Sequence, residues 1–115
     1  MNPKVKPLWT VALRSDDFKQ GKYKLRTHED KYCCLGVLGH LAVAAGAIPE
    51  PEFYSSWKTD SGRGEWEYDG DACGLAPALR EWAGLTHDSI NDLISLNDGQ
   101  GKSFSEIADW IDENL

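Results

Sequence analysis

Cysteine and long apolar stretches are scarce in this sequence. Its three cysteines are an odd number with two of them adjacent, Cys33 and Cys34, so they do not match the paired framework of small disulfide-rich secreted domains. The longest stretch without a polar side chain, Leu41 to Pro49, is less than half the length needed to cross a bilayer. We therefore expect no membrane partner and a cytoplasmic protein whose thiols stay reduced.

Positive charge is also in short supply. The chain has 12 Lys and Arg against 19 Asp and Glu, which gives a formal net charge of −7. Such a balance opposes binding to phosphate backbones and anionic membranes, so duplex nucleic acid is not expected as a partner. The same charge suits a protein that docks on a basic surface, although it also keeps an ordinary domain soluble. The amino terminus lacks the apolar segment of a signal peptide.

Familiar catalytic and metal-binding motifs are missing too. Gly99–Ser103 resembles the end of a phosphate-binding P-loop, but Leu96 stands where the motif needs its first glycine. As a calcium loop the segment fails because Leu96 and Ile107 fall at ligand positions that should be acidic. No Cys-x-x-Cys pair is present for zinc. We predict no metal site, no cofactor and no catalytic residues, and the sequence favours binding over catalysis.

The chain does contain enough apolar residues to form one folded domain. Its 115 residues, 41% of them apolar and five of them tryptophan, predict a single domain over residues 1–115. Helical periodicity and end signals predict helices from Pro7 to about Ser15, about Tyr32 to Gly46, Pro77 to Ala83, Thr86 to Leu96, and from Ser103 onward. We expect an α+β fold of about four to five helices around a central buried helix, with a short β-hairpin.

Several local patterns support this arrangement. Apolar residues cover more than one face of the helix expected from Tyr32 to Gly46, which marks it as the buried one, and Gly46 can adopt the left-handed cap. Small residues on the same helix, among them Gly36 and Gly39, would let another backbone approach closely. Glu65–Asp69 alternates aromatic and acidic residues like a half-buried strand, in a hairpin whose turn is Ser61–Gly64. The segment Asp16–Arg26 is interpreted as an ordered connection.

Cations and aromatic side chains are concentrated in segments predicted as loops or strands. Guanidinium groups fork onto phosphates and aromatic faces stack on bases, so these residue types together form a pocket for a small nucleotide-like anion. The candidate ligand-binding residues are Arg14, Lys22, Tyr23, Arg26, Trp57, Arg63, Trp66, Lys102 and Ser103. Two plainer interpretations stay open. The lysines can coat a solvated loop while tryptophans fill the core, and Ser103 can belong to an ordinary capping box with Glu106.

Six short motifs extend over nearly the whole chain. They are Trp9-x-x-x-Leu13-Arg14-Ser15, Lys19-Gln20-Gly21, Leu25-Arg26, Tyr32-Cys33-Cys34-Leu35-Gly36-Val37-Leu38, Leu96-Asn97-Asp98 and Ser103-Phe104-x-x-Ile107-Ala108-Asp109. With this pattern the chain resembles a family of small, uncharacterised phage and prophage proteins, whose members often carry a cysteine where this chain has Gly39. The resemblance implies no catalytic residues. It implies an accessory protein that binds and disables a component of the infected host cell.

Three functions follow from this resemblance and from the residues. The first is a counter-defence sponge that sequesters a small nucleotide-type immune signal, with Arg14, Arg26 and Lys102 on its phosphates. The second is an acidic, anti-CRISPR-like inhibitor that binds a host defence nuclease. The third is a small nucleotide-cleaving enzyme. Since sponges often build pockets between subunits, a homo-oligomer is also expected under the first function.

Overall fold

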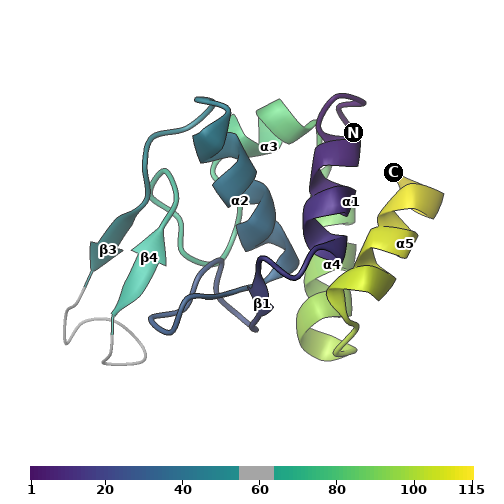
Figure 1. Cartoon of the computed structure of the whole chain (residues 1–115). Helices are drawn as coiled ribbons and strands as arrows, with labels where there is room; N and C mark the ends of the chain where they lie inside the picture. The colour runs from purple at the N-terminus through teal and green to yellow at the C-terminus, as the bar shows by residue number, and fades with distance from the viewer. Residues whose placement is uncertain (55–63) are drawn as a thin grey trace.

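A mostly apolar helix, α2 (Cys34–Ala44), runs through the middle of the computed structural model, which describes residues 1–54 and 64–115 (Figure 1). Residues on all its sides are buried, from Cys34 through Gly39 and at Ala42, as expected for a helix covered from several directions. Beyond its end Gly46 has a φ of 74°, the predicted left-handed conformation, and Ile48 is buried in the core. The prediction of a central buried helix is confirmed.

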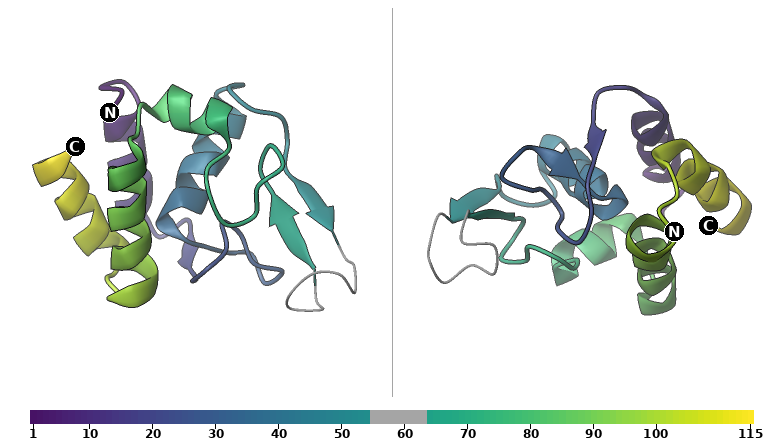
Figure 2. Two further views of the ribbon diagram at one scale, coloured as in Figure 1. Left: turned by 180° about the vertical axis from the view of Figure 1, so that it is seen from behind. Right: turned by 90° about the horizontal axis from the view of Figure 1, so that it is seen from below.

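Helices from the two ends of the chain lie together on one side of α2 (Figure 1). The helices α1 (Lys6–Arg14) and α5 (Phe104–Asn114) lie side by side, with α1 also packed on α2 (Figures 1 and 2). Trp9 of α1 is fully buried, and its indole N–H donates to the carbonyl of Cys34 at 3.0 Å. The first turn of α5 carries the predicted capping box, in which Ser103 and Glu106 each accept a backbone N–H of the other.

The helices α3 (Pro77–Ala83) and α4 (His87–Ile94) complete the helical part. Gly84, with a φ of 67°, ends α3 as predicted. The expected helix from Thr86 to Leu96 is wrong at its end, because α4 stops at Ile94 and continues as a π-helical turn, η1 (Ser95–Gly99). Asn97 of this turn is buried, and its side-chain amide forms hydrogen bonds with the backbone of Gly21 and Cys34.

Strands are few and short. β1 (Lys19–Gln20) and β2 (Lys31–Tyr32) pair in parallel through two residues each. β1 lies in the segment Asp16–Arg26, which the sequence predicted as a connection. Tyr32, predicted as the approximate start of the central helix, belongs to β2 instead. The predicted hairpin is present as the antiparallel pair β3 (Glu52–Tyr54) and β4 (Glu65–Glu67), which projects from the end of the molecule opposite α5 (Figures 1 and 2). Of its predicted turn, only Gly64 lies within the described residues.

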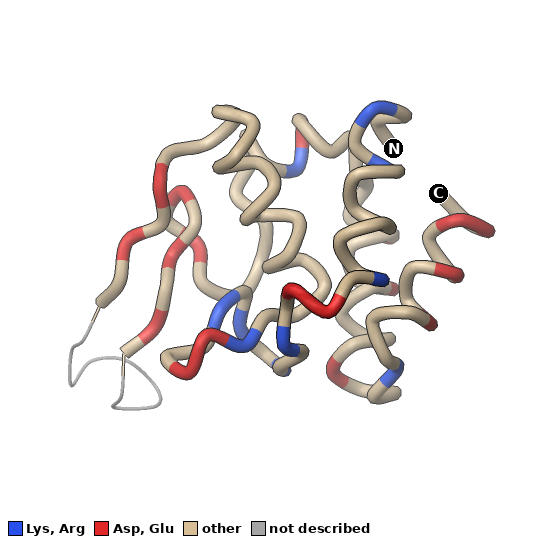
Figure 3. Tube along the Cα trace, viewed as in Figure 1, with Lys and Arg blue, Asp and Glu red and all other residues tan. Residues whose placement is uncertain are grey.

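The fold is therefore α+β, as expected, with five α-helices and a short antiparallel hairpin among the described residues. No helix in those parts of the chain combines the length and the apolar character that crossing a membrane requires. The two ends of the molecule are chemically alike. Asp and Glu occur along both strands of the hairpin and again along α5, while most Lys and Arg lie between them (Figure 3).

Candidate functional site

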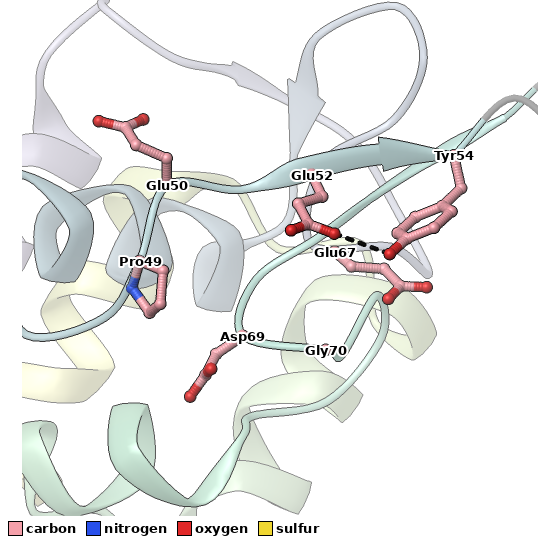
Figure 4. A pocket seen from close by; sticks show the side chains of 7 residues that line it. All are labelled: Pro49, Glu50, Glu52, Tyr54, Glu67, Asp69 and Gly70. Atoms are coloured by element: carbon pink, nitrogen blue, oxygen red, sulfur yellow. Dashed lines mark hydrogen bonds between the residues drawn. The ribbon is translucent and has the colours of Figure 1, made fainter.

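A hollow of about 140 Å³ opens beside the hairpin. Its lining consists of Pro49, Glu50, Glu52, Tyr54, Glu67, Asp69 and Gly70 (Figure 4). Four carboxylates and one phenol make up its chemistry, so it attracts a cation and repels a phosphate. Even so, no group of three or more His, Cys, Asp or Glu side chains in the described residues is arranged to hold a metal ion. An extended cation such as a Lys or Arg side chain suits the hollow better.

The register of the hairpin explains why these carboxylates gather. Glu52 lies directly opposite Glu67, Phe53 opposite Trp66, and Tyr54 opposite Glu65. Since successive side chains of a strand point to opposite faces, the two glutamates share one face while the two rings share the other. Like charges directly opposite each other destabilise an antiparallel pair. The hairpin therefore keeps an electrostatic repulsion that a bound cation would relieve.

Tyr54 strengthens the acidic character of this face. Its hydroxyl donates to a carboxylate oxygen of Glu52 at 2.7 Å, and both side chains extend from the same side of β3 (Figure 4). That hydrogen bond, and then the negative charge of Glu52, raise the pKa of Tyr54. The hydroxyl stays protonated and holds the carboxylate in place. The ring remains 44% exposed and available for contact with a ligand.

A second hollow, of about 300 Å³, lies between η1 and α5. Its lining residues are Leu96, Lys102, Glu106, Asp109, Trp110 and Glu113. The Lys102 ammonium is 3.8 Å from the Glu106 carboxylate, and Asp109 already pairs with Arg14. With Arg14 counted, the three carboxylates of the lining face two cations, so this hollow is weakly acidic.

Arg14, a predicted phosphate ligand, closes the contact between α1 and α5. Its guanidinium donates to Asp109 at 2.8 Å and to Asp112 at 2.7 Å. These hydrogen bonds, first to Asp109 and then to Asp112, raise the pKa of Arg14. A phosphate at this group would lie beside two carboxylates that already neutralise its charge.

Arg26 and Trp66, two further predicted ligands, bind each other. The guanidinium carbon is 3.9 Å from the Trp66 ring centroid and 5.5 Å from that of Tyr32, which is a cation–π arrangement. The same guanidinium pairs with Asp30 at 2.8 Å. Burial raises the pKa of nearby Tyr68 to about 12, and its enclosed hydroxyl has no hydrogen-bond partner among the described residues. Arg26 thus fixes the base of the hairpin.

Lys22, Tyr23, Lys102 and Ser103 gather around the turn before α5. The Tyr23 ring is 69% exposed, and its backbone N–H donates to Asp98 at 3.1 Å. The Lys22 ammonium lies near Gly101, 3.8 Å from where a Cβ would stand. Ser103, however, uses its hydroxyl and its N–H in the capping box, so its polar groups serve the helix.

The described residues do not form the single anion pocket that the sequence predicted. Arg14 and Lys102 lie along α5, whereas Arg26 and Trp66 lie at the base of the hairpin, at the other end of the molecule (Figures 1 and 3). The physical reason is that each of these three cations faces a carboxylate of the protein. Trp57 and Arg63, also predicted, lie outside the described residues.

The carboxylates of the hairpin hollow were not among the predicted site residues. A signal was present, because the alternation in Glu65–Asp69 indicated an acidic face. The partner carboxylates Glu50 and Glu52 could not be placed opposite this face, since the register between the strands is not readable from either strand alone.

The fold and the site define this protein as a small α+β domain with two acidic hollows. The chain belongs to the family described as domain of unknown function DUF8296, whose model matches residues 1–115. No curated protein and no solved structure matches the chain.

Proposed function

We propose that this chain is an acidic binding protein that inhibits a host defence protein with a basic surface, and that it acts without catalysis. The observation that carries the proposal is the lining of its hollows. Carboxylates dominate both, at the hairpin and along α5. Carboxylates favour Lys and Arg side chains and disfavour phosphate, and the net charge of −7 extends the same preference over the molecule.

The kind of partner follows from this charge and from the resemblance to small phage and prophage proteins. A defence nuclease must present Lys and Arg in a groove that holds nucleic acid. An acidic protein seated in that groove competes with the nucleic acid for the same cations. Its site of action would be the cytoplasm of an infected bacterial cell, which agrees with the free thiols of Cys33 and Cys34.

The nucleotide sponge is less well supported by the geometry. Arg14 and Arg26, which it needs for phosphates, are already neutralised by Asp109, Asp112 and Asp30. Breaking such a pair to admit a phosphate exchanges one charge-assisted hydrogen bond for another, with little gain in free energy.

The experiment that tests the proposal compares the two ligand classes directly. The protein is mixed with a panel of purified, guide-loaded CRISPR effector nucleases, and complexes are detected by gel filtration and by loss of DNA cleavage. We expect a complex with a nuclease of the panel that weakens as salt rises, because screening shortens the range of charge attraction. In parallel, cyclic dinucleotides and ADP-ribose derivatives are titrated by calorimetry, and no heat is expected.

Two other outcomes would contradict the proposal, and each identifies a different function. Heat from a nucleotide without any nuclease complex would establish the sponge instead. Recovery of a chemically altered nucleotide would establish the enzyme.

A further inference from the structure

The outer strand of the hairpin has an open edge. Within residues 1–54 and 64–115, β3 pairs only with β4. The partner strand β4 lies toward the body of the protein (Figure 1), and its Glu65 and Trp66 side chains contact Lys24, at 3.3 Å, and Arg26. All three residues of β3 are exposed. An open strand edge offers unpaired N–H and C=O groups to an added strand.

The side chains of β3 specify what such a strand would carry. Glu52 and Tyr54 lie on one face, next to the acidic hollow, and Phe53 lies on the other. Phe53 is 43% exposed although its ring packs on Trp66, with centroids 5.2 Å apart. One face of β3 thus fits a cation and the opposite face fits an apolar side chain.

We infer that β3 is a docking edge for an extended segment of the partner protein in which basic and apolar residues alternate. The inference rests on the proposed function and names the surface and the partner chemistry for it. The segment adds to the sheet as a strand beside β3. Its Lys or Arg side chains face Glu52 and enter the hollow, where they relieve the repulsion between Glu52 and Glu67, while its apolar side chains cover Phe53.

Charge also determines which strands this edge rejects. Charged residues on edge strands prevent edge-to-edge pairing between copies of a protein, and Glu52 would oppose a second acidic β3 in that way. The same carboxylate attracts a basic strand. The β3 edge therefore disfavours a second copy of this protein and favours a basic strand.

The test uses the whole protein and a short synthetic peptide of alternating arginine and valine. Binding is measured by calorimetry at low salt, and the site is mapped from backbone amide shifts in NMR spectra. Two control peptides separate strand addition from charge alone. One has the same composition with its arginines at one end, and the other has N-methyl groups on alternate backbone amides, which remove N–H donors without changing charge.

We expect the alternating peptide to bind and to shift the amides of β3. Both control peptides should bind about tenfold more weakly, since each lost hydrogen bond or misplaced pair costs a modest amount. Glu52→Gln should weaken binding of the alternating peptide about two- to fivefold, the range for a cross-strand charge pair. Glu81→Gln, the same charge change on an exposed side chain of α3 that lines neither hollow, should leave it unaltered.

Equal binding of the three peptides, or shifts confined to α5 with equal effects of Glu52→Gln and Glu81→Gln, would overturn the docking edge and leave the proposed function standing. A nuclease complex that persists while the alternating peptide fails to bind would do the same. Absence of both the nuclease complex and the peptide complex would overturn the proposed function itself.

Discussion

The side-chain oxygen of Asn97 accepts a hydrogen bond from the backbone N–H of Cys34 at 3.2 Å and thereby ties η1 to the first turn of α2. The same oxygen accepts from the Gln20 amide at 3.0 Å, and the Asn97 amide donates to the Gly21 carbonyl at 2.9 Å. Asn97 is only 1% exposed. Three motifs far apart in the sequence thus meet at one buried side chain.

Asn97→Ala should therefore destabilise the fold by about 2–4 kcal/mol, because it leaves several buried donors and acceptors without partners. The free energy of unfolding in urea measures this loss. Asn91→Ala on the exposed face of α4 is the matched control and should change stability by less than about 0.5 kcal/mol. Equal effects of the two substitutions would mean that the Asn97 network contributes nothing to stability.

The sequence could reveal features whose causes are local. Ser103 and Glu106 stand three residues apart and cap α5 by themselves, and Gly46 and Gly84 take the left-handed conformation that other residues rarely adopt. These signals predicted three of the helix ends within about two residues.

Features that depend on distant partners could not be predicted. The parallel pairing of β1 with β2 and the π-turn at Asn97 both require partners more than ten residues away. For the site, the sequence predicted cations and aromatic rings as the ligand-binding groups. It could not show that Arg14 and Arg26 are neutralised by the protein's own carboxylates.

Gly36 tests the close packing predicted for α2. A Cβ at this position would stand 1.7 Å from the Leu25 carbonyl oxygen, so backbone would have to move. Gly36→Ala should destabilise the protein by at least about 3 kcal/mol. Gly39→Ala, one turn further along α2, is the control. Its Cβ would contact the Tyr68 ring at 3.3 Å, and alanine improves helix propensity by about 1 kcal/mol over glycine, so this variant should lose far less stability. Thermal unfolding of both variants should separate them clearly, and similar melting temperatures would contradict the packing.

The adjacent thiols of α2 should be inert in the folded protein. Burial raises the pKa of Cys33 to about 11 and that of Cys34 in the same direction. Since the thiolate is the reactive form, iodoacetamide near neutral pH should alkylate the exposed Cys73 first and the other two only after unfolding. Mass spectrometry of timed samples checks this order. Early modification of Cys33 would show that its environment is open to solvent.

The same shift has a consequence for stability in alkali. A thiol whose pKa is raised on folding favours the folded state below its ordinary pKa, and that contribution is lost as the pH rises from there through about 11. Cys33→Ser, whose hydroxyl does not ionise in this range, should therefore show a shallower loss of stability over that window than the unaltered chain. Urea unfolding at several alkaline pH values measures the two slopes, and parallel slopes would contradict the assignment.

Removing the repulsion across the hairpin should stabilise it. Glu67→Gln takes away one of two carboxylates that face each other in register, so the free energy of unfolding should rise by about 0.2–1 kcal/mol at low salt. The gain should shrink as salt screens the pair. Glu29→Gln makes the same change in net charge on an exposed loop outside the hairpin and should bring no comparable gain. Should Glu67→Gln also weaken binding of the basic peptide, the acidic pair would be a feature kept for binding at the expense of stability.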